Sequence, residues 1–307
     1  MPKIKVIVNP TAGHGYGAQA SPIIRQILTR LGADFDLVHT TAPGEATLLA
    51  RQARAEGYEI IVAVGGDGTS HEVVNGLMVP GNGPVAGTLG CIPAGSGNDF
   101  AEMNGAPRDL EAACRLIVAG ASRLVDLGQV TIDGKITQYF ANAVGIGFDG
   151  VVTRERLKFK YLRGMALYLP VVLKTIFVTM RPPRIELRYD DETFQQRTLM
   201  TVISNGPREG GAFLVAPAAR CNDGELDLTV VETMPKLSML AMVPRFMSGS
   251  HIRHRLVKSL RARQICVTSE DPLYLHVDGE LPCEEAHQVE VRVVPACLRM
   301  IAPPSHS

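Results

Sequence analysis

The first 130 residues alternate apolar, β-branched segments with segments of helical periodicity, and this alternation constrains the fold more than any other feature of the sequence. A parallel sheet covered by helices on both faces has strands that are apolar throughout, as Ile60–Val64 is. Repeated βα units of this kind predict an α/β domain. The predicted strands are Ile4–Val8, Phe35–His39, Ile60–Val64, Thr88–Ile92 and Leu124–Leu127, and the predicted helices are Ile23–Leu31, Ala46–Glu56 and Ser70–Met78.

Beyond about residue 127 the sequence changes to β-rich segments separated by turn residues. The dipeptide Asp133-Gly134 lies between two such segments, where it favours a tight hairpin turn. We predict a first domain over residues 1–128 and, over residues 129–294, a mostly antiparallel β-sandwich with a helical insertion at residues 153–180. The predicted strands of the second domain are Ile185–Tyr189, Arg197–Ile203, Leu226–Val231, Leu256–Val267, Tyr274–Val277 and Val289–Val294.

The composition excludes several classes of protein. Lys and Arg together number 31, as do Asp and Glu, so the chain lacks the net positive charge with which a protein coats nucleic acid. The six cysteines form no CxxC pair, which argues against a zinc site and indicates reduced thiols in a cytoplasmic protein. The first residues show no signal peptide, and the most apolar stretch, Leu167–Met180, is shorter than the ~20 residues of a transmembrane helix.

The strongest local motif is the turn Gly65-Gly66-Asp67-Gly68-Thr69, which follows an apolar strand and precedes a helix. Glycines let the backbone approach a ligand closely, and the free amides of a helix N-terminus bind phosphate. An aspartate facing phosphate implies an intervening Mg²⁺ ion or ordered water. The pattern GxxxxGK[ST] is absent, so the turn is not a Walker A loop. The alternative is a tight strand-to-helix turn in which Asp67 acts as a cap.

Two further glycine-rich turns follow predicted strands, and the ends of parallel strands meet at one edge of a sheet. These turns are Asn9–Gly15 and Pro93–Phe100. In the second, Ser96 supplies a hydroxyl that can donate to phosphate, whereas Asn98 or Asp99 can equally act as a helix N-cap. Because the turns share an edge, we interpret them together as one ligand-binding region.

Six blocks occur in a fixed order along the chain: Asn9–Gly13, Gly65–Thr69, Gly95–Phe100, Asn142–Asp149, Asn222–Asp227 and Asp278–Glu280. In this order they resemble the soluble bacterial lipid kinases of the diacylglycerol kinase catalytic-domain family, which share that domain with sphingosine and ceramide kinases. The resemblance covers nearly the whole chain. It implies a NAD kinase/diacylglycerol kinase-like α/β nucleotide-binding domain followed by a β-sandwich, with the segment 295–307 returning to the first domain. It also implies a kinase that uses ATP and Mg²⁺.

The resemblance places the ATP site by position. The family often has threonine where this chain has Ser96, and the hydroxyl is kept. Thr40 rather than its neighbour Thr41 is chosen by its spacing to Gly44-Glu45-Ala46. The implied ATP contacts are Asn9, Pro10, Thr11, Ala12, Gly13, Thr40, Gly65, Gly66, Asp67, Gly68, Thr69, Ser70, His71 and Ser96.

The resemblance also implies the metal site and the general base. Mg²⁺ is assigned to the Asp223 carboxylate and to the backbone carbonyls of Arg220 and Glu225, next to Asn222, where many members have aspartate. Glu280 matches the general base of the family.

Elementary chemistry agrees, because a lipid hydroxyl must give its proton to a carboxylate as the phosphoryl group leaves ATP. We expect Glu280 to face Asp67 across a cleft between the domains, and Asp126, which follows the fifth strand, to support the metal network. The alternatives are that Glu280 is an exposed hairpin-turn residue and that Asp126 is a cap at the start of a loop.

Two base-rich segments bear on the lipid. The segment Arg154–Arg163 interleaves basic and apolar residues and leads into the apolar residues of Leu167–Phe177. Helices of this type lie in membrane interfaces and attract anionic lipid. The segment Thr233–Ser269 has no acidic residue and seven basic ones. For both segments the alternative is a solvated basic face over an ordinary core.

Three functions follow from these observations. The first is an ATP-dependent lipid kinase, with diacylglycerol as the first-choice substrate and phosphatidylglycerol or a sphingoid base as the others. The second is an NAD kinase-like enzyme for a soluble substrate, which the insertion at 153–180 and the Asp-Gly-Glu turn oppose. The third is a non-catalytic lipid-binding protein, which intact Asp67, Asp223 and Glu280 oppose. For the first function we predict a cytoplasmic enzyme that associates peripherally with the membrane, with a lipid alcohol and a transient membrane surface as partners, no nucleic acid, and a homodimer as an open alternative.

Overall fold

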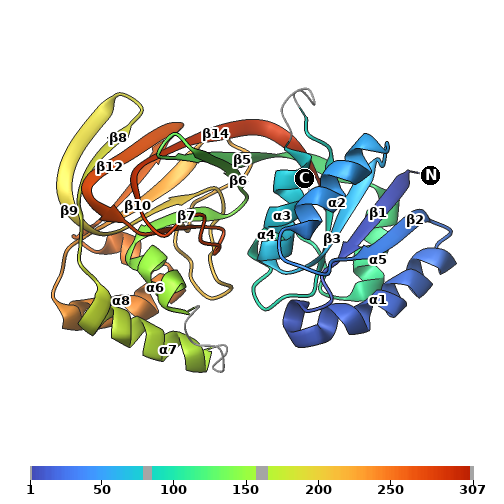
Figure 1. Ribbon diagram of the computed structural model, residues 1–307, viewed down its shortest axis with the longest axis horizontal. Coiled ribbons are helices and arrows are strands. Elements are labelled where there is room, and N and C mark those ends of the chain that lie inside the picture. Colours follow the sequence, from blue (N-terminus) through green and yellow to red (C-terminus); the bar gives the residue numbers. More distant parts are fainter. Residues whose placement is uncertain (1, 79–84, 157–164, 305–307) are drawn as a thin grey trace. The chain divides into compact units, whose positions relative to one another are not determined.

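The computed structural model describes residues 2–78, 85–156 and 165–304, and these residues divide into two compact units (Figure 1). Unit 1 comprises Met1–Leu127, Cys221–Asp223 and Val294–Ser307, and unit 2 comprises Gly128–Arg220 and Gly224–Val293. Two long strands, β5 (Ser122–Ile132) and β14 (Ala286–Ile301), contribute residues to both units. Each unit is described by itself below.

Unit 1 is built on a parallel sheet with the strand order β14-β4-β3-β1-β2. The strand β3 is buried at all its residues, as its apolar sequence predicts. At the edge of the sheet, Arg299 and Met300 of β14 pair with the start of β4 in parallel. The bounds are β1 Lys3–Val8, β2 Asp34–His39, β3 Ile60–Gly65 and β4 Thr88–Pro93.

Helices cover both faces of this sheet (Figure 1). On one face, alternate residues of β1 and β3 such as Val6 and Val62 form a buried cluster with Leu28 and Ile117 of two helices. On the other face, two helices contact β1 and β3 and pack so closely that a Cβ at Gly76 would lie 2.4 Å from the Thr47 carbonyl oxygen. The predicted α/β domain is therefore confirmed. The helices are α1 Ala12–Arg30, α2 Glu45–Ala55, α3 Asp67–Leu77, α4 Asp99–Met103 and α5 Leu110–Ala119.

Unit 2 is built on antiparallel strands, as predicted. Their order is β11-β10-β9-β8-β12-β14, with β7 paired to β9 and β13, and β6 paired to β5. Their inward side chains form one apolar cluster that contains Val144, Val230 and Val267. The bounds are β6 Ile136–Phe140, β7 Ala143–Gly147, β8 Arg184–Tyr189, β9 Glu192–Ser204, β10 Leu226–Glu232, β11 Val257–Ala262, β12 Gln264–Leu273 and β13 Leu275–Val277.

Helices of unit 2 pack on a second apolar cluster with β9 and β10, which contains Val172, Ile176 and Met239. No helix within the described residues is long and apolar enough to span a bilayer. The helices are α6 Phe148–Arg156, α7 Met165–Lys174, the π-helical turn Thr175–Thr179, α8 Lys236–Ser248 and the 3-10 turn Ser250–Arg253.

Three elements of unit 2 differ from the sequence expectation, and the first is the strand β7, which was not predicted. The segment Leu256–Val267, predicted as one strand, is two strands that meet at Arg263. The Asp190 carboxylate accepts the backbone amides of Arg263 and Gln264, both at 3.0 Å, which fixes the bend between them. The helix α8 was not predicted, because it contains Pro244 and follows Pro235, and prolines usually mark a break.

Candidate active site

The three glycine-rich turns of unit 1 lie against one another at the carboxyl ends of β1, β3 and β4. The Ala94 amide donates to the Gly65 carbonyl at 2.8 Å. A Cβ at Gly13 would lie 2.2 Å from the Ala94 carbonyl oxygen, and a Cβ at Gly95 would lie 2.3 Å from the Gly66 Cα. These separations are shorter than any side chain permits, so glycine is required where the turns touch. The structure thus brings together turns that are far apart in sequence.

The first turn is organised by the side chain of Asn9. Its Oδ1 accepts the Thr11 amide at 3.1 Å and the Thr11 hydroxyl at 2.8 Å, and its Nδ2 donates to the Thr69 hydroxyl at 3.1 Å in the second turn. The residues Gly13, His14 and Gly15 have φ of 55°, 61° and 95°. Successive amides in such a turn form a concave surface that binds anions. The predicted contacts Pro10 and Ala12 belong to the same turn, in which Pro10 and Asn9 accept backbone amides through their carbonyl oxygens.

The second turn leads directly into α3. The helix begins at Asp67, three residues earlier than predicted, so the amides after Gly66 belong to its first turn. The predicted contacts Thr69, Ser70 and His71 are buried, whereas Gly68 is partly exposed. The Asp67 carboxylate accepts the backbone amides of Asn98 at 2.8 Å and of Phe100 at 3.1 Å.

Asp67 therefore caps the start of α4 in the third turn. The sequence alternative was a cap of the turn's own helix, but Asn98, the first residue whose amide Asp67 accepts, lies 31 residues further along the chain. A role for Asp67 toward metal or water stays a prediction.

The two remaining predicted nucleotide contacts also belong to unit 1. Thr40 is buried at the end of β2, and its amide donates to the Val8 carbonyl at 2.9 Å. The neighbouring Thr41 hydroxyl instead donates to the Glu45 carboxylate at 2.8 Å. Ser96 is exposed at the tip of the third turn. The Thr40 hydroxyl donates to the same Val8 carbonyl at 3.5 Å, so both threonine hydroxyls have partners, and the choice of Thr40 as a nucleotide contact stays a prediction.

The predicted metal residues lie in the segment that crosses the boundary of the two units. Arg220 and Asp223 are exposed, and the Glu225 carboxylate pairs with Arg261 at 3.0 Å. Asp126, in contrast, is 3% exposed, and its Oδ1 accepts the Ala296 amide at 2.7 Å. Its own amide donates to the Cys221 carbonyl at 2.6 Å, so Asp126 links β5, β14 and the start of the metal segment within unit 1.

Glu280 lies in unit 2, on a two-residue hairpin turn after β13. Asp278 and Gly279 have φ of 49° and 83°, and Val277 and Glu280 exchange two backbone hydrogen bonds of 2.9 Å. Positive φ at both central residues defines a type I′ turn, which Asp-Gly favours. The Asp278 carboxylate accepts the amides of residues 141, 142 and 143 at 2.8–3.0 Å. The Glu280 side chain is exposed, and because it belongs to unit 2, its proximity to Asp67 stays a prediction.

A cluster of two carboxylates around the buried His276, beside this turn, was missed from the sequence. His276 Nε2 lies 2.6 Å from Glu209 Oε1 and 3.1 Å from Asp149 Oδ2, and the imidazole is fully buried. Burial and the neighbouring Asp149 raise the pKa of Glu209 to about 7. Although burial favours the uncharged forms, the opposite charges hold the pKa of His276 above and that of Asp149 below its ordinary value. Asp149 is the last residue of the sequence block Asn142–Asp149, but no pattern in the sequence connects it with Glu209.

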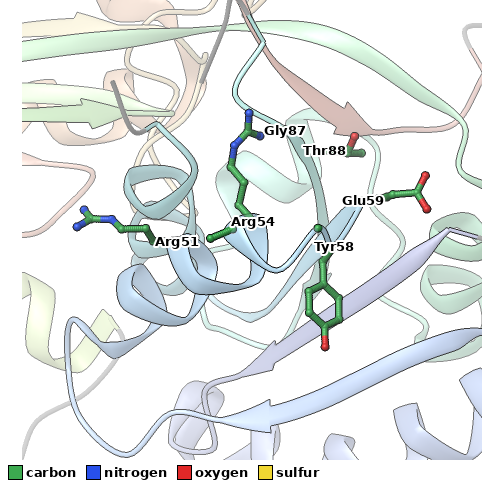
Figure 2. Close-up of a pocket in the computed structure, with 8 residues that line it drawn as sticks. Arg51, Arg54, Tyr58, Glu59, Gly87 and Thr88 are labelled. Atoms are coloured by element: carbon green, nitrogen blue, oxygen red, sulfur yellow. The ribbon is translucent and has the colours of Figure 1, made fainter. Parts of the chain in front are cut away.

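A separate open pocket of about 600 Å³ lies in unit 1 (Figure 2). Glu59 precedes β3 and Thr88 begins β4, so the pocket is at the amino ends of these strands, away from the glycine-rich turns. The basic side chains of Arg51 and Arg54 reach it from α2. It contains none of the predicted site residues.

Comparison with known families matches most of the chain. The family described as "Diacylglycerol kinase catalytic domain" matches residues 3–130, and the family described as "YegS C-terminal NAD kinase beta sandwich-like domain" matches residues 142–302.

Individual relatives that match the chain are named as diacylglycerol kinases. The chain is 31% identical to a diacylglycerol kinase of Bacillus subtilis (strain 168), over 91% of this chain and 90% of that protein. It is 29% identical to a diacylglycerol kinase of Mycobacterium tuberculosis (strain ATCC 25618 / H37Rv), over 98% and 95%. A crystal structure of a diacylglycerol kinase from Bacillus anthracis str. Sterne has the same fold, with a TM-score of 0.75 at 24% identity, covering 100% of this chain and 98% of that one.

Proposed function

This chain belongs to the diacylglycerol kinase catalytic-domain family, and we propose that it transfers the γ-phosphoryl group of ATP to the hydroxyl of diacylglycerol, giving phosphatidic acid. Membership of the family supports a lipid kinase that uses ATP. The choice of diacylglycerol rests on the names of the relatives and is the part that needs a test.

The observation that carries the proposal is the contact of the three glycine-rich turns in unit 1. Phosphoryl transfer depends mainly on positioning the phosphates and on stabilising their charge. The left-handed residues 13–15 and the start of α3 offer backbone amides at one edge of the sheet, where parallel sheets bind ligands. We propose that the phosphates of ATP lie over Asn9–Gly13 and Gly65–His71, with the hydroxyls of Thr40 and Ser96 as further contacts.

The donor atoms of residues 220–225 fit Mg²⁺. Asp223 presents an exposed carboxylate, and the carboxylate of Glu225 is engaged by Arg261, which leaves the Glu225 backbone carbonyl as the donor in the proposal. Carboxylate and carbonyl oxygens are the ligands that Mg²⁺ prefers. The ion would neutralise charge on the transferring phosphoryl group. We propose that Asp223 and the carbonyls of Arg220 and Glu225 hold it, with Asp67 and Asp126 ordering the backbone segments around it.

Glu280 is the proposed general base. A carboxylate at the end of an exposed turn is open to a substrate hydroxyl, and the turn itself is held by the contacts of Asp278 with residues 141–143. A base must be held within hydrogen-bond distance of the proton that it removes. Glu280 therefore combines an accessible carboxylate with a fixed backbone.

The lipid substrate lies in a bilayer, and we propose that unit 2 contacts it through α7, α8 and the π-helical turn. The exposed apolar side chains there include Phe177, Val178 and Leu237, which are 45%, 73% and 75% exposed. Lys236 is adjacent, since its Nζ donates to the Phe177 carbonyl at 2.9 Å. Apolar residues beside a lysine suit an anionic membrane surface. Of the predicted membrane segments, residues 157–163 and the side chains of residues 167–169 lie outside the described residues.

The test is a phosphotransfer assay with radiolabelled ATP, Mg²⁺ and diacylglycerol in mixed detergent micelles, with phosphatidylglycerol, a sphingoid base and NAD as parallel substrates. We expect phosphatidic acid as the main product and a loss of at least about 100-fold in kcat for Glu280→Gln, because general base catalysis supplies about 10²–10⁴-fold. Labelling of NAD in the absence of lipid would contradict the lipid-kinase proposal. A Glu280→Gln enzyme with the turnover of the unmodified protein would remove Glu280 as the base.

A further inference from the structure

The Asp-Gly-Glu turn is held at Gly279 through both its backbone amide and its backbone carbonyl. The Gly279 amide donates to His276 Nδ1 at 3.1 Å, and its carbonyl accepts from Arg156 Nη2 at 3.4 Å. Gly279 is the residue directly before Glu280, so its orientation sets where the Glu280 side chain starts. The contact with His276 is the shorter of the two and comes from a fully buried ring.

The His276 ring has little freedom to turn. Glu209 Oε1 and Asp149 Oδ2 contact its Nε2 from unit 2, and the absence of a side chain at Gly145 makes room for them. A Cβ at Gly145 would lie 2.3 Å from Nε2 and 2.6 Å from Asp149 Oδ2. The two carboxylates and the glycine together fix the plane of the imidazole, which faces Gly279 with its other nitrogen.

The hydrogen bond from Gly279 also determines the tautomer. Because the amide donates to Nδ1, this nitrogen carries no proton, and the uncharged ring holds its proton on Nε2, which faces the carboxylates. The two carboxylates raise the pKa of His276, and the geometry places the additional proton that this cluster attracts on a carboxyl group rather than on Nδ1. A metal ion at this cluster would need the lone pair of Nε2 and would move the proton to Nδ1, where it would face a second donor. The geometry therefore favours a proton-sharing cluster over a metal site. A Glu209 pKa of about 7 agrees, since the carboxyl can hold the additional proton.

We propose that His276 is a positioning residue for the phosphotransfer reaction: oriented by Glu209 and Asp149, its imidazole fixes the Gly279 amide and so the place of the Glu280 carboxylate. The inference rests on the proposed role of Glu280 as base. Displacement of a reacting group by about 1 Å costs on the order of 100-fold in rate. His276 thus affects kcat without contacting the substrate.

Two variants separate the contacts of the ring. In His276→Asn the side-chain carbonyl occupies the place of Nδ1, so the acceptor for Gly279 is kept while the contact with the carboxylates is lost. In His276→Gln the amide extends toward the carboxylates and the acceptor beside Gly279 is lost. We expect kcat to fall about 100-fold for His276→Gln and less than about 10-fold for His276→Asn. KM for ATP should not change in either, because the predicted ATP contacts belong to unit 1.

The matched control is His251→Asn. His251 is also a fully buried histidine of unit 2, but its Nε2 contacts the Val215 carbonyl at 3.0 Å and its ring stacks on Phe246. This variant should lower the melting temperature and leave kcat per folded molecule within about two-fold, because it leaves the distances between the reacting groups intact. Folded fractions are measured by circular dichroism and thermal unfolding for every variant.

Equal kcat values for His276→Gln and His276→Asn would overturn the inference, because the acceptor for Gly279 would then be irrelevant. A fall in kcat that only follows the loss of folded protein, as in the control, would also overturn it. The proposed function fails separately: an unmodified chain that phosphorylates no lipid refutes the lipid kinase, and an active Glu280→Gln refutes the base. Inactive Glu280→Gln beside fully active His276→Gln would refute only the positioning role.

Discussion

The contact between the first and third glycine-rich turns allows the proposed ATP site to be tested by a single methyl group. In Gly13→Ala the new Cβ would lie 2.2 Å from the Ala94 carbonyl oxygen, whereas ordinary contacts begin at 3.4 Å. One turn must therefore move by about 1.2 Å, and misplacement of about 1 Å costs on the order of 100-fold in a positioned reaction. We expect kcat/KM for ATP to fall by about that factor.

Gly15→Ala is the matched control in the same turn. Gly15 also has a positive φ, of 95°, but its Cβ would meet nothing within 4 Å. Left-handed backbone costs an alanine roughly 1–2 kcal/mol, so both variants should lose about this part of the free energy of unfolding, and Gly13→Ala should lose more because its Cβ also meets the Ala94 carbonyl oxygen. Only Gly13→Ala should displace a neighbouring turn, and kcat/KM for Gly15→Ala should therefore fall by less than about 10-fold.

A graded series completes the test. A Cβ at Gly66 would lie 3.1 Å from the Gly95 Cα, so the third turn would have to move by only a few tenths of an ångström. Gly66→Ala should therefore lie between the other two variants in its affinity for ATP, measured by calorimetric titration alongside the radiolabel assay. The same ATP affinity in all three variants would refute the reasoning, because it would show that the contact of the turns does not shape the nucleotide site.

Three other predictions concern the metal, the membrane and pH. Asp223→Asn should raise the Mg²⁺ concentration for half-maximal activity at least about 10-fold and change the free energy of unfolding by less than about 0.5 kcal/mol, since the residue is exposed; an unchanged Mg²⁺ titration would count against this site. Val178→Asp with Leu237→Asp should weaken sedimentation with anionic vesicles about 10-fold or more relative to Leu48→Asp, an exposed leucine of unit 1 that is 62% exposed; equal sedimentation would place membrane contact elsewhere. The pKa of Glu209 is raised to about 7, so the folded state holds a proton that the unfolded state releases above its ordinary pKa of 4.5. The free energy of unfolding should therefore fall as pH rises from about 5 to 7. Urea unfolding of Glu209→Gln should lack this part of the pH dependence, and the same pH dependence in the variant and the unmodified protein would contradict the prediction.

The sequence predicts well the features that depend on local pattern. Continuous apolar segments such as Ile60–Val64 mark buried parallel strands, because both faces of such a strand meet helices. The dipeptide Asp133-Gly134 marks a hairpin, since both residues adopt the positive φ that the turn requires. The same local rules extend to Asp278-Gly279, where the turn carries the proposed base.

Features that depend on contacts between distant segments were not predicted. The break at Arg263 is set by Asp190, which lies more than 70 residues away in sequence. The alternation of apolar and polar residues therefore does not indicate where the strand breaks. The Asp67 carboxylate accepts backbone amides of another turn. Capping rules consider only residues that are neighbours in sequence, so they do not predict this contact. Glu209 and His276 are brought together only by the tertiary fold, and no spacing in the sequence indicates that they are in contact.

The strand β14 has a consequence for how the protein is made. Residues 294–302 belong to unit 1, where Arg299 and Met300 pair with β4 and the Ala86 amide donates to the Cys297 carbonyl. During translation, β4 therefore leaves the ribosome long before the segment that covers its edge, and an uncovered strand edge readily pairs with other chains. The nascent first unit thus passes through a stage at which it needs protection from aggregation. A ribosome-stalled chain that ends before residue 294 should bind chaperones more strongly than one extended past residue 302.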